Sequence, residues 1–267
     1  MSFYDYRGKP AKFDTTFENI KSNMLLMHGY DEVADTRYTI LRIFKQRTDG
    51  TKQFPFVRYA REGSTNKNAI ELRAKEGWHL IFNAGMGQGL VIQNGIVLTD
   101  AVPTKHVGAM PLTIDSNGDL SYVDADTAGK GSQIVASGVV SAVCGFFPIV
   151  DNYEKYDYPK DIPETIELPT WQHAQRQIIG QFSNGDYAII TGEGRGYADS
   201  IGFSIDEEQE LCMRLGLRFA YNLDGGGSTQ TLLDKKSVNT IYENETGRRM
   251  PTYIVFNGTD TYSIPSN

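Results

Sequence analysis

The stretch LVIQNGIVL, residues 90–98, decides the fold class, because two apolar runs flank an Asn-Gly pair. Asn-Gly favours the two positive φ angles of a type I′ turn, so this stretch predicts a β-hairpin. Comparable pairs recur between apolar or aromatic runs at Asp49-Gly50, Asn117-Gly118, Asn184-Gly185 and Asn257-Gly258. Turns of this kind along the whole chain predict a structure made largely of antiparallel β-sheet.

Two helices are predicted among these hairpins. One covers residues 205–215, where Ser204 precedes the first turn and Glu207 follows three residues later, which is the pattern of a capping box. Gly216 supplies its stop. The other helix is predicted over about residues 66–76. Because a strand-like segment follows each helix at once, we expect a single α+β domain with a mixed, largely antiparallel sheet, hairpins and a few helices.

The composition is that of a folded chain with an excess of acidic groups. The 267 residues are 40% hydrophobic and include 15 Tyr and 13 Phe, which supply a core and exclude disorder. A formal net charge of −7 opposes sequence-independent binding to nucleic acid, so we expect no nucleic-acid partner. The two Cys and four His have no metal-ligand spacing, so no cofactor is predicted, although the sequence leaves a divalent cation open.

The N-terminal region has no targeting signal. Residues 1–10 carry charged side chains and lack the apolar segment of a signal peptide. The longest apolar stretch, residues 139–150, is too short to cross a bilayer. We therefore expect no membrane span and a protein that is cytoplasmic when made. Residues 1–36 are interpreted as an N-terminal arm or attachment segment, and residues 37–267 as the domain.

The most informative motif is YNLDGGGST, residues 221–229. A strand ends at an acidic residue, three glycines follow, and two hydroxyl residues come next. Consecutive glycines let the backbone approach a ligand closely and direct N–H groups into one concavity, which suits an anion or a sugar oxygen. No lysine follows the glycines, so the motif is not a Walker A loop. On composition alone, a tight turn between two strands explains it equally well.

Two other predicted strand ends carry polar residues among small ones. Residues 191–197 (TGEGRGY) place Glu193 and Arg195 among glycines, which suits a site for an anion and a hydroxyl group. A surface turn with a weak ion pair is the other interpretation. Residues 81–89 (IFNAGMGQG) place Asn83 at the end of an apolar strand, beside any ligand there, although ordinary turn chemistry also favours this pattern.

Taken in order, these segments resemble the phosphodiester glycosidase family, the domain of N-acetylglucosamine-1-phosphodiester α-N-acetylglucosaminidases. Residues 222–228 (NLDGGGS) are identical to the family's motif, and the resemblance covers about residues 69–256 with preserved spacing. Partial matches lie at residues 83–87, 175–180, 193–195 and 248–251. The departures from the family pattern are Ala84, Met86, Gly87, Gln175 and Glu193.

The resemblance implies a hydrolase, a phosphodiester glycosidase that cleaves the glycosidic C1–O bond of a sugar-1-phosphodiester. Such a reaction needs positive charge on the phosphate and a carboxylate near the developing oxocarbenium ion. The catalytic residues implied are Asp224, as base or nucleophile, and Glu193, as its partner or as a ligand of a sugar hydroxyl. The substrate-binding residues implied are Asn83, Arg176, Arg195, Asn222, Gly225, Gly226, Gly227, Ser228, Arg248 and Arg249.

The family also occurs in bacterial envelope proteins and phage virion proteins, and the missing signal peptide favours the phage setting. The expected partner is a sugar-phosphate substrate or a phosphate-containing cell-wall glycopolymer. Association with a virion, or a homo-oligomer, is compatible with the sequence. The alternative is a non-catalytic glycopolymer-binding or structural domain of a phage tail or baseplate protein, which the departures at Ala84, Met86 and Glu193 slightly favour.

Overall fold

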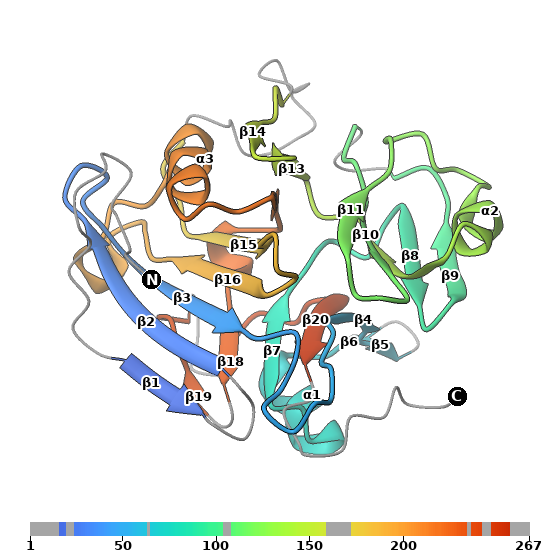
Figure 1. Cartoon of the computed structure of the whole chain (residues 1–267), viewed down its shortest axis with the longest axis horizontal. Coiled ribbons are helices and arrows are strands. Elements are labelled where there is room, and N and C mark those ends of the chain that lie inside the picture. Colours follow the sequence, from blue (N-terminus) through green and yellow to red (C-terminus); the bar gives the residue numbers. More distant parts are fainter. Residues whose placement is uncertain are drawn as a thin grey trace.

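Three large antiparallel sheets and one two-stranded hairpin make up the described part of the protein in a computed structural model, whose elements are drawn in Figure 1. It describes residues 24–62, 65–103, 108–158, 172–233, 236–241 and 247–256, and the backbone of residues 16–19. Every strand pairing among these residues is antiparallel. With three α-helices beside the sheets, the single α+β domain expected from the sequence is confirmed.

The largest sheet has eight strands in the order β1-β2-β3-β16-β15-β17-β13-β14. Their bounds are β1 (Thr16–Asn19), β2 (Met24–Asp31), β3 (Thr36–Ile43), β13 (Phe147–Asp151), β14 (Glu154–Lys155), β15 (Arg176–Gln181), β16 (Tyr187–Gly192) and β17 (Phe219–Asn222). We call it the main sheet. β3 begins at Thr36, and β2, which lies within the segment predicted as an N-terminal arm, pairs with β3 along its whole length.

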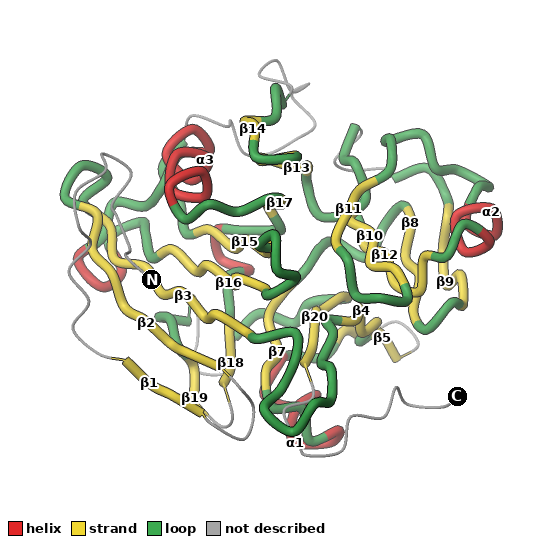
Figure 2. Tube along the Cα trace, in the orientation of Figure 1, coloured by secondary structure: helices red, strands yellow, loops and turns green. Residues whose placement is uncertain are grey.

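Two five-stranded sheets pack beside the main sheet (Figure 2). The second sheet has the order β11-β10-β12-β8-β9, with bounds β8 (Leu90–Gln93), β9 (Ile96–Asp100), β10 (Leu112–Asp115), β11 (Leu120–Tyr122) and β12 (Val139–Val143). The third sheet has the order β19-β18-β7-β20-β4, with bounds β4 (Phe56–Tyr59), β7 (Leu80–Asn83), β18 (Thr231–Leu233), β19 (Lys236–Ser237) and β20 (Thr252–Phe256). A small hairpin pairs β5 (Arg61–Glu62) with β6 (Thr65–Asn66).

The three sheets share one hydrophobic core, and each α-helix packs against one of them. The shared core joins apolar side chains of all three sheets, among them Ile179, Phe82 and Leu112. Helix α3 (Ile205–Arg214) packs on the main sheet, α2 (Gly131–Ala136) on the second and α1 (Ala69–Glu76) on the third. No helix in the described segments is long and apolar enough to span a membrane.

Turn and cap chemistry agree with the sequence in most places. Asn94 and Gly95 join β8 to β9 with φ angles of 51° and 75°, the two positive values predicted. The capping box at Ser204 and Glu207 is present in α3. Helix α1 begins later than residue 66, because Asn68 caps it with its side chain. The turn predicted at Asn257-Gly258 lies outside the described residues. Helix α2 was not predicted from the sequence.

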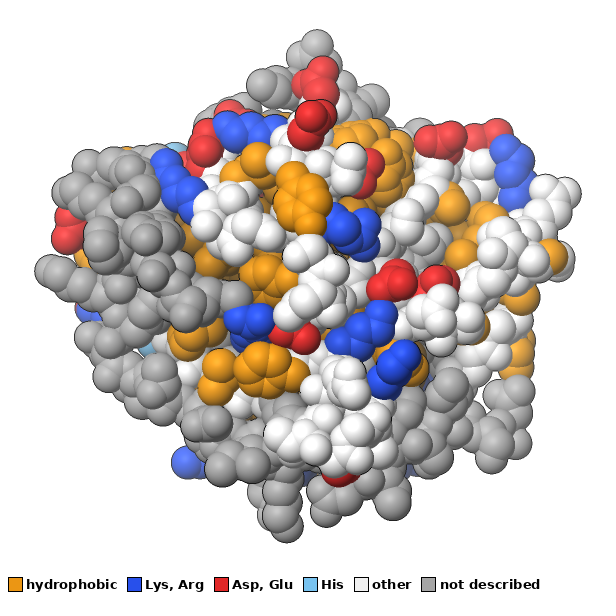
Figure 3. Space-filling model, in the orientation of Figure 1, with side chains coloured by type: hydrophobic (Ala, Val, Ile, Leu, Met, Phe, Trp, Pro, Cys, Tyr) orange, Lys and Arg blue, Asp and Glu red, His pale blue; other side chains and the backbone are white. Residues whose placement is uncertain are grey.

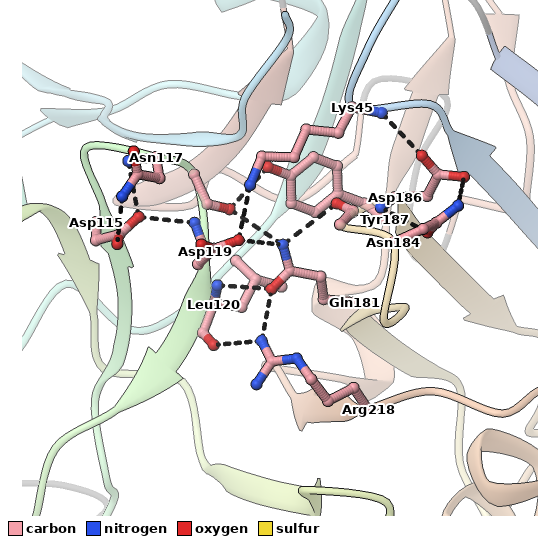
Figure 4. Close-up of polar contacts among 12 residues, drawn as sticks. Lys45, Asp115, Asn117, Asp119, Leu120, Gln181, Asn184, Asp186, Tyr187 and Arg218 are labelled. Carbon is pink, nitrogen blue, oxygen red and sulfur yellow. Dashed lines mark hydrogen bonds and ion pairs between the residues drawn. The ribbon is translucent and has the colours of Figure 1, made fainter.

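A buried glutamine fastens the second sheet to the main sheet. Gln181, at the end of β15, accepts hydrogen bonds at Oε1 from Leu120 N (3.0 Å) and Arg218 Nη2 (2.8 Å). Its Nε2 donates to Asp119 Oδ1 (3.0 Å) and Gly185 O (3.2 Å). Figure 4 shows these contacts converging on one amide. Its hydrogen-bonding capacity is used across three separate segments.

Two ion pairs lie near the Gln181 amide. Lys45 Nζ lies 2.7 Å from Asp119 Oδ1, and Arg42 Nη2 lies 2.7 Å from Asp186 Oδ2. On the face drawn in Figure 3, basic and acidic side chains lie next to each other near the centre and form no continuous basic patch. The Lys45–Asp119 pair contributes little, because the Asp119 side chain is half exposed, and the Arg42–Asp186 pair lies within the main sheet. The buried amide is therefore the stronger connection between the two sheets.

Replacing this amide tests the junction. Gln181→Leu leaves the buried Leu120 N–H without an acceptor and removes one of the two acceptors of Arg218 Nη2, which should lower the free energy of unfolding by about 2 kcal/mol. Chemical denaturation measures the loss. Gln133→Leu, on the exposed side of α2, is the control and should change stability by less than about 0.5 kcal/mol. Equal effects of the two substitutions would contradict the structural role of Gln181.

Candidate functional site

The NLDGGGS motif forms the connection between the main sheet and the third sheet. β17 ends at Asn222, and β18 begins at Thr231. Between them Asp224 N donates to Ala84 O (2.9 Å), at the end of β7, and Gly226 N donates to Gln175 O (2.8 Å), just before β15. One turn of 3₁₀ helix spans Gly226–Ser228. The segment 223–230, which we call the glycine loop, therefore crosses the ends of β7, β15 and β17.

The side chain of Asn83 holds this loop at both ends. It is fully buried, with Nδ2 donating to Asp224 O (2.5 Å) and Oδ1 accepting from Gln230 N (3.0 Å). Both functional atoms of the amide thus bind main chain. The sequence predicted that Asn83 contacts the sugar; the structure places it where it positions Asp224.

Asp224 presents a buried carboxyl group beside a hydroxyl and a guanidinium. It is 6% exposed, and burial raises its pKa to about 6, while a hydrogen bond with the Ser228 side chain and the charge of Arg248 act in the opposite direction. Arg248 Nη1 also donates to Ser228 Oγ (3.3 Å). Oδ2 of Asp224 has no hydrogen-bond partner in the structure. A carboxylate held this way can accept a proton or attack an electrophilic carbon.

Arg195 lies against the glycine loop. A Cβ added to Gly226 would lie 3.1 Å from Arg195 Nη2, and Gly226 itself has a φ of +57°. At Gly225 a Cβ would lie 2.7 Å from Gln175 O, so these two glycines are required by close approach; Gly227 is buried beside them. The exposed Arg195 side chain has no hydrogen bond or ion pair within the described part of the chain. Its guanidinium is therefore available to an anion at the loop.

The other predicted arginines have protein partners. Arg176 is buried, with Nε donating to Phe203 O (2.9 Å) and Nη2 to Gln172 O (2.6 Å). Burial lowers its pKa, and the nearby Glu208 opposes that shift. Arg249 instead pairs with Glu71 of α1, at 2.6 Å. Of the two adjacent arginines 248 and 249, the structure thus brings Arg248 to Asp224 and Ser228.

Glu193 and Asn222 are buried near strand ends. Glu193 is 8% exposed, its Oε1 accepts from Thr240 N (2.7 Å), and burial raises its pKa. Its Oε2 and the Oδ1 of Asn222 have no hydrogen-bond partner. The contacts of Glu193 are with β3 and residue 240, whereas those of Asp224 are with Ala84, Ser228 and Arg248. The two carboxyl groups predicted to act together are therefore held by different segments.

Sequence reasoning missed Gln175 and Thr229. Both amide atoms of the Gln175 side chain and the hydroxyl of Thr229 are buried without a hydrogen-bond partner, as is Asp224 Oδ2. Buried polar atoms are normally satisfied by protein, water or ligand, so the unpartnered atoms around this loop make it the candidate binding site. Thr229 could have been predicted from its position directly after the glycines and Ser228. Gln175 was noted only as a departure from the family pattern, and no sequence feature indicated a role in binding. No group of three metal-ligating side chains occurs in the described segments.

Comparison with known proteins identifies relatives of this chain. A relative from Bacillus subtilis, the SPbeta prophage-derived uncharacterized protein YomE, is 29% identical over 199 residues. The match covers 67% of this chain and 28% of that protein, so the chain spans little more than a quarter of its relative's length.

Solved structures show the same fold. The catalytic domain of zebrafish N-acetylglucosamine-1-phosphodiester α-N-acetylglucosaminidase, auto-inhibited by its pro-peptide, matches with a TM-score of 0.62 and 12% identity over 96% of this chain and 87% of that one. A hypothetical protein from Synechocystis also gives a TM-score of 0.62, at 13% identity over 88% of this chain and 62% of that one. The family model described as phosphodiester glycosidase matches residues 64–257. The chain belongs to the phosphodiester glycosidase family.

Proposed function

We propose that this protein hydrolyses the glycosidic C1–O bond of a sugar-1-phosphodiester. Membership of the family supports the reaction class. The observation that carries the proposal is the buried carboxyl of Asp224, which has one unpartnered oxygen and lies beside Ser228 and Arg248. Buried acids with raised pKa values next to a cation are typical of catalytic sites.

The reaction requires two kinds of group, and the site supplies both. A phosphate monoester is a weakly basic leaving group, so its departure needs positive charge more than a proton donor. Arg248 and Arg195 provide that charge, since guanidinium groups bind phosphate oxygens in pairs. Asp224 acts on the sugar side as base or nucleophile at C1. Asn222 accepts from or donates to a sugar hydroxyl, and Gly226 lets the substrate lie close to the loop.

The remaining predicted residues have supporting roles in this proposal. Arg176 lies beneath the loop, where a Cβ on Gly225 would be 3.7 Å from its Cα, and its charge adds to the field at the phosphate. Arg249 forms an ion pair with Glu71, which holds the backbone of residues 248–249 and thereby positions Arg248. Asn83 positions the Asp224 backbone.

We propose a phosphate-containing cell-wall glycopolymer as substrate, which a phage protein meets at the host surface; the prophage origin of the Bacillus relative supports this setting.

Incubation of the protein with purified wall teichoic acid distinguishes hydrolysis of the polymer, binding without hydrolysis and a purely structural role. Release of sugar supports hydrolysis. Retention of the polymer without release indicates a binding domain, and neither outcome indicates a structural role in a virion.

Removing the Asp224 carboxylate should abolish hydrolysis. Asp224→Asn should lower kcat/KM on the 1-(methyl phosphate) diesters of N-acetylglucosamine and glucose by about 100-fold or more, because the amide can neither accept the proton nor attack C1. Release of reducing sugar measures the rate. Asp126→Asn, on an exposed residue, is the matched control and should leave the rate unchanged. Wild-type activity in Asp224→Asn would contradict the assignment.

Stability distinguishes a catalytic role from damage to the fold. The pKa of Asp224 is raised in the folded protein, so its contribution to stability is greatest at low pH and is lost as pH rises through about 6. The neutral amide of Asp224→Asn should therefore leave the melting temperature at pH 7.5 equal to or above that of the wild type. A melting temperature several degrees lower would assign Asp224 to the fold.

The pH profile tests the state of this carboxyl group. Because Asp224 acts as a carboxylate, kcat/KM should fall below about pH 6. Ser228→Ala removes a hydrogen bond that lowers this pKa, so the acid limb should move upward by roughly half a unit. A rate that rises on acidification through pH 6 would show that the protonated form is active and would contradict the proposed role.

A further inference from the structure

A pocket lined by no residue of the glycine loop lies beside Glu193. Its volume is about 340 Å³, and its walls come from β2, from β3, from Glu193 and Ala198 in the segment after β16, and from Val238. β2 and β3 precede residue 64, so this wall is built by a part of the chain outside the family-model match. None of the pocket residues contacts Asp224 through a hydrogen bond among the described residues.

One wall of the pocket carries a buried hydrogen-bond acceptor. Glu193 is more than nine-tenths buried, with Oε1 bound to Thr240 N and Oε2 without a partner. An unpartnered carboxylate oxygen at this depth is costly unless a ligand or water donates to it. Hydroxyl groups of a sugar or polyol are the donors that a carboxylate in such a pocket binds.

A cation lies next to Glu193 in the same pocket. The guanidinium of Arg37 lies over the ring of Tyr30, 5.7 Å from its centroid, and makes no hydrogen bond or ion pair within the described segments. Tyr30 OH donates to Asp35 Oδ1 (2.5 Å), which fixes the ring. Glu193 N donates to Arg37 O (2.9 Å), so the guanidinium of Arg37 and the carboxylate of Glu193 belong to residues that lie next to each other across β3 and the end of β16. A phosphate oxygen is the natural ligand of such an arginine.

A strained segment connects this pocket with the glycine loop. Arg195, Ala198 and Asp199 have φ angles of 57°, 51° and 51°. Positive φ at residues other than glycine costs energy and concentrates at functional sites. The segment is held in place by Arg195 N donating to Ile201 O (3.0 Å) and Ile201 N donating to Asp35 O (2.9 Å). It brings Arg195 to Gly226 at one end and Ala198 to the pocket at the other.

We propose that this pocket is a second subsite, which binds the repeating unit next to the one that is cleaved in a phosphate-linked glycopolymer. The phosphate of that unit binds Arg37, and a hydroxyl of that unit donates to Glu193. The inference rests on the proposed function, because it assumes a polymer with a sugar phosphate in the glycine-loop site. The carboxyl group of Glu193, at the family's acidic position, accepts from Thr240 N, and its second oxygen is left for that hydroxyl.

Binding to inactive protein tests the subsite without turnover. In the Asp224→Asn background, titration calorimetry compares N-acetylglucosamine 1-(methyl phosphate) with an oligomer of three N-acetylglucosamine 1-phosphate units. Adding Arg37→Gln should raise Kd for the oligomer by about tenfold, as expected for a lost charged hydrogen bond, and Kd for the single unit by less than twofold. Arg61→Gln, an exposed arginine of β5, is the matched control and should change neither Kd.

The outcomes separate this inference from the proposed function. Equal weakening of both ligands by Arg37→Gln, or no weakening of either, would overturn the subsite. If the subsite result holds while Asp224→Asn retains full hydrolysis, the catalytic assignment fails and the subsite stands. Glu193→Gln, which keeps the size of the side chain, should also weaken the oligomer selectively. A loss of kcat on the single unit alone would instead make Glu193 the partner of Asp224 and would overturn its role here.

Discussion

The two hydrogen bonds of the Asn83 side chain are the constraint on which the site depends. They bind Asp224 O and Gln230 N, so one buried amide holds both ends of the glycine loop against the end of β7. Main-chain hydrogen bonds of Leu223, Asp224 and Gly226 hold the loop as well, and several restraints are needed because three glycines lose more conformational entropy on ordering than other residues. With the backbone held, the carboxyl of Asp224 stays buried beside Ser228 and Arg248, and burial raises its pKa to about 6.

The site is costly to fold, and the rest of the molecule offsets that cost. Unpartnered polar atoms at Gln175, Asn222 and Asp224 and positive φ angles at Arg195, Ala198 and Asp199 all disfavour the folded state. A core shared by three sheets and the fully bonded amide of Gln181 stabilise the surrounding framework. Several of the unmet hydrogen bonds and positive φ angles thus lie in the segments that face the substrate in our proposal, as expected where function opposes stability.

Local chemistry could be predicted from the sequence, whereas long-range pairing could not. Asn94-Gly95 and the Ser204 capping box depend on neighbouring residues alone, and both are found as predicted. Asp224 and Ser228 lie beside Arg248 in the structure. This proximity could be predicted only from the resemblance to the family, whose motifs occur in the same order along the chain. The hydrogen bonds of Asn83 and Arg176 to distant main chain, and the pairing of β3 with β16, depend on contacts more than 20 residues apart, which no local pattern reports.

The central claim is that water replaces phosphate at the sugar carbon, and isotope labelling of the products tests it most directly. Hydrolysis of a sugar-1-phosphodiester is run in heavy-oxygen water, and the released phosphate monoester is examined by mass spectrometry. Cleavage of the C1–O bond leaves the bridging oxygen on phosphorus, so our account predicts an unlabelled phosphate product. Incorporation of the heavy isotope into the phosphate would show attack at phosphorus and would contradict the assignment of Asp224 to the sugar carbon.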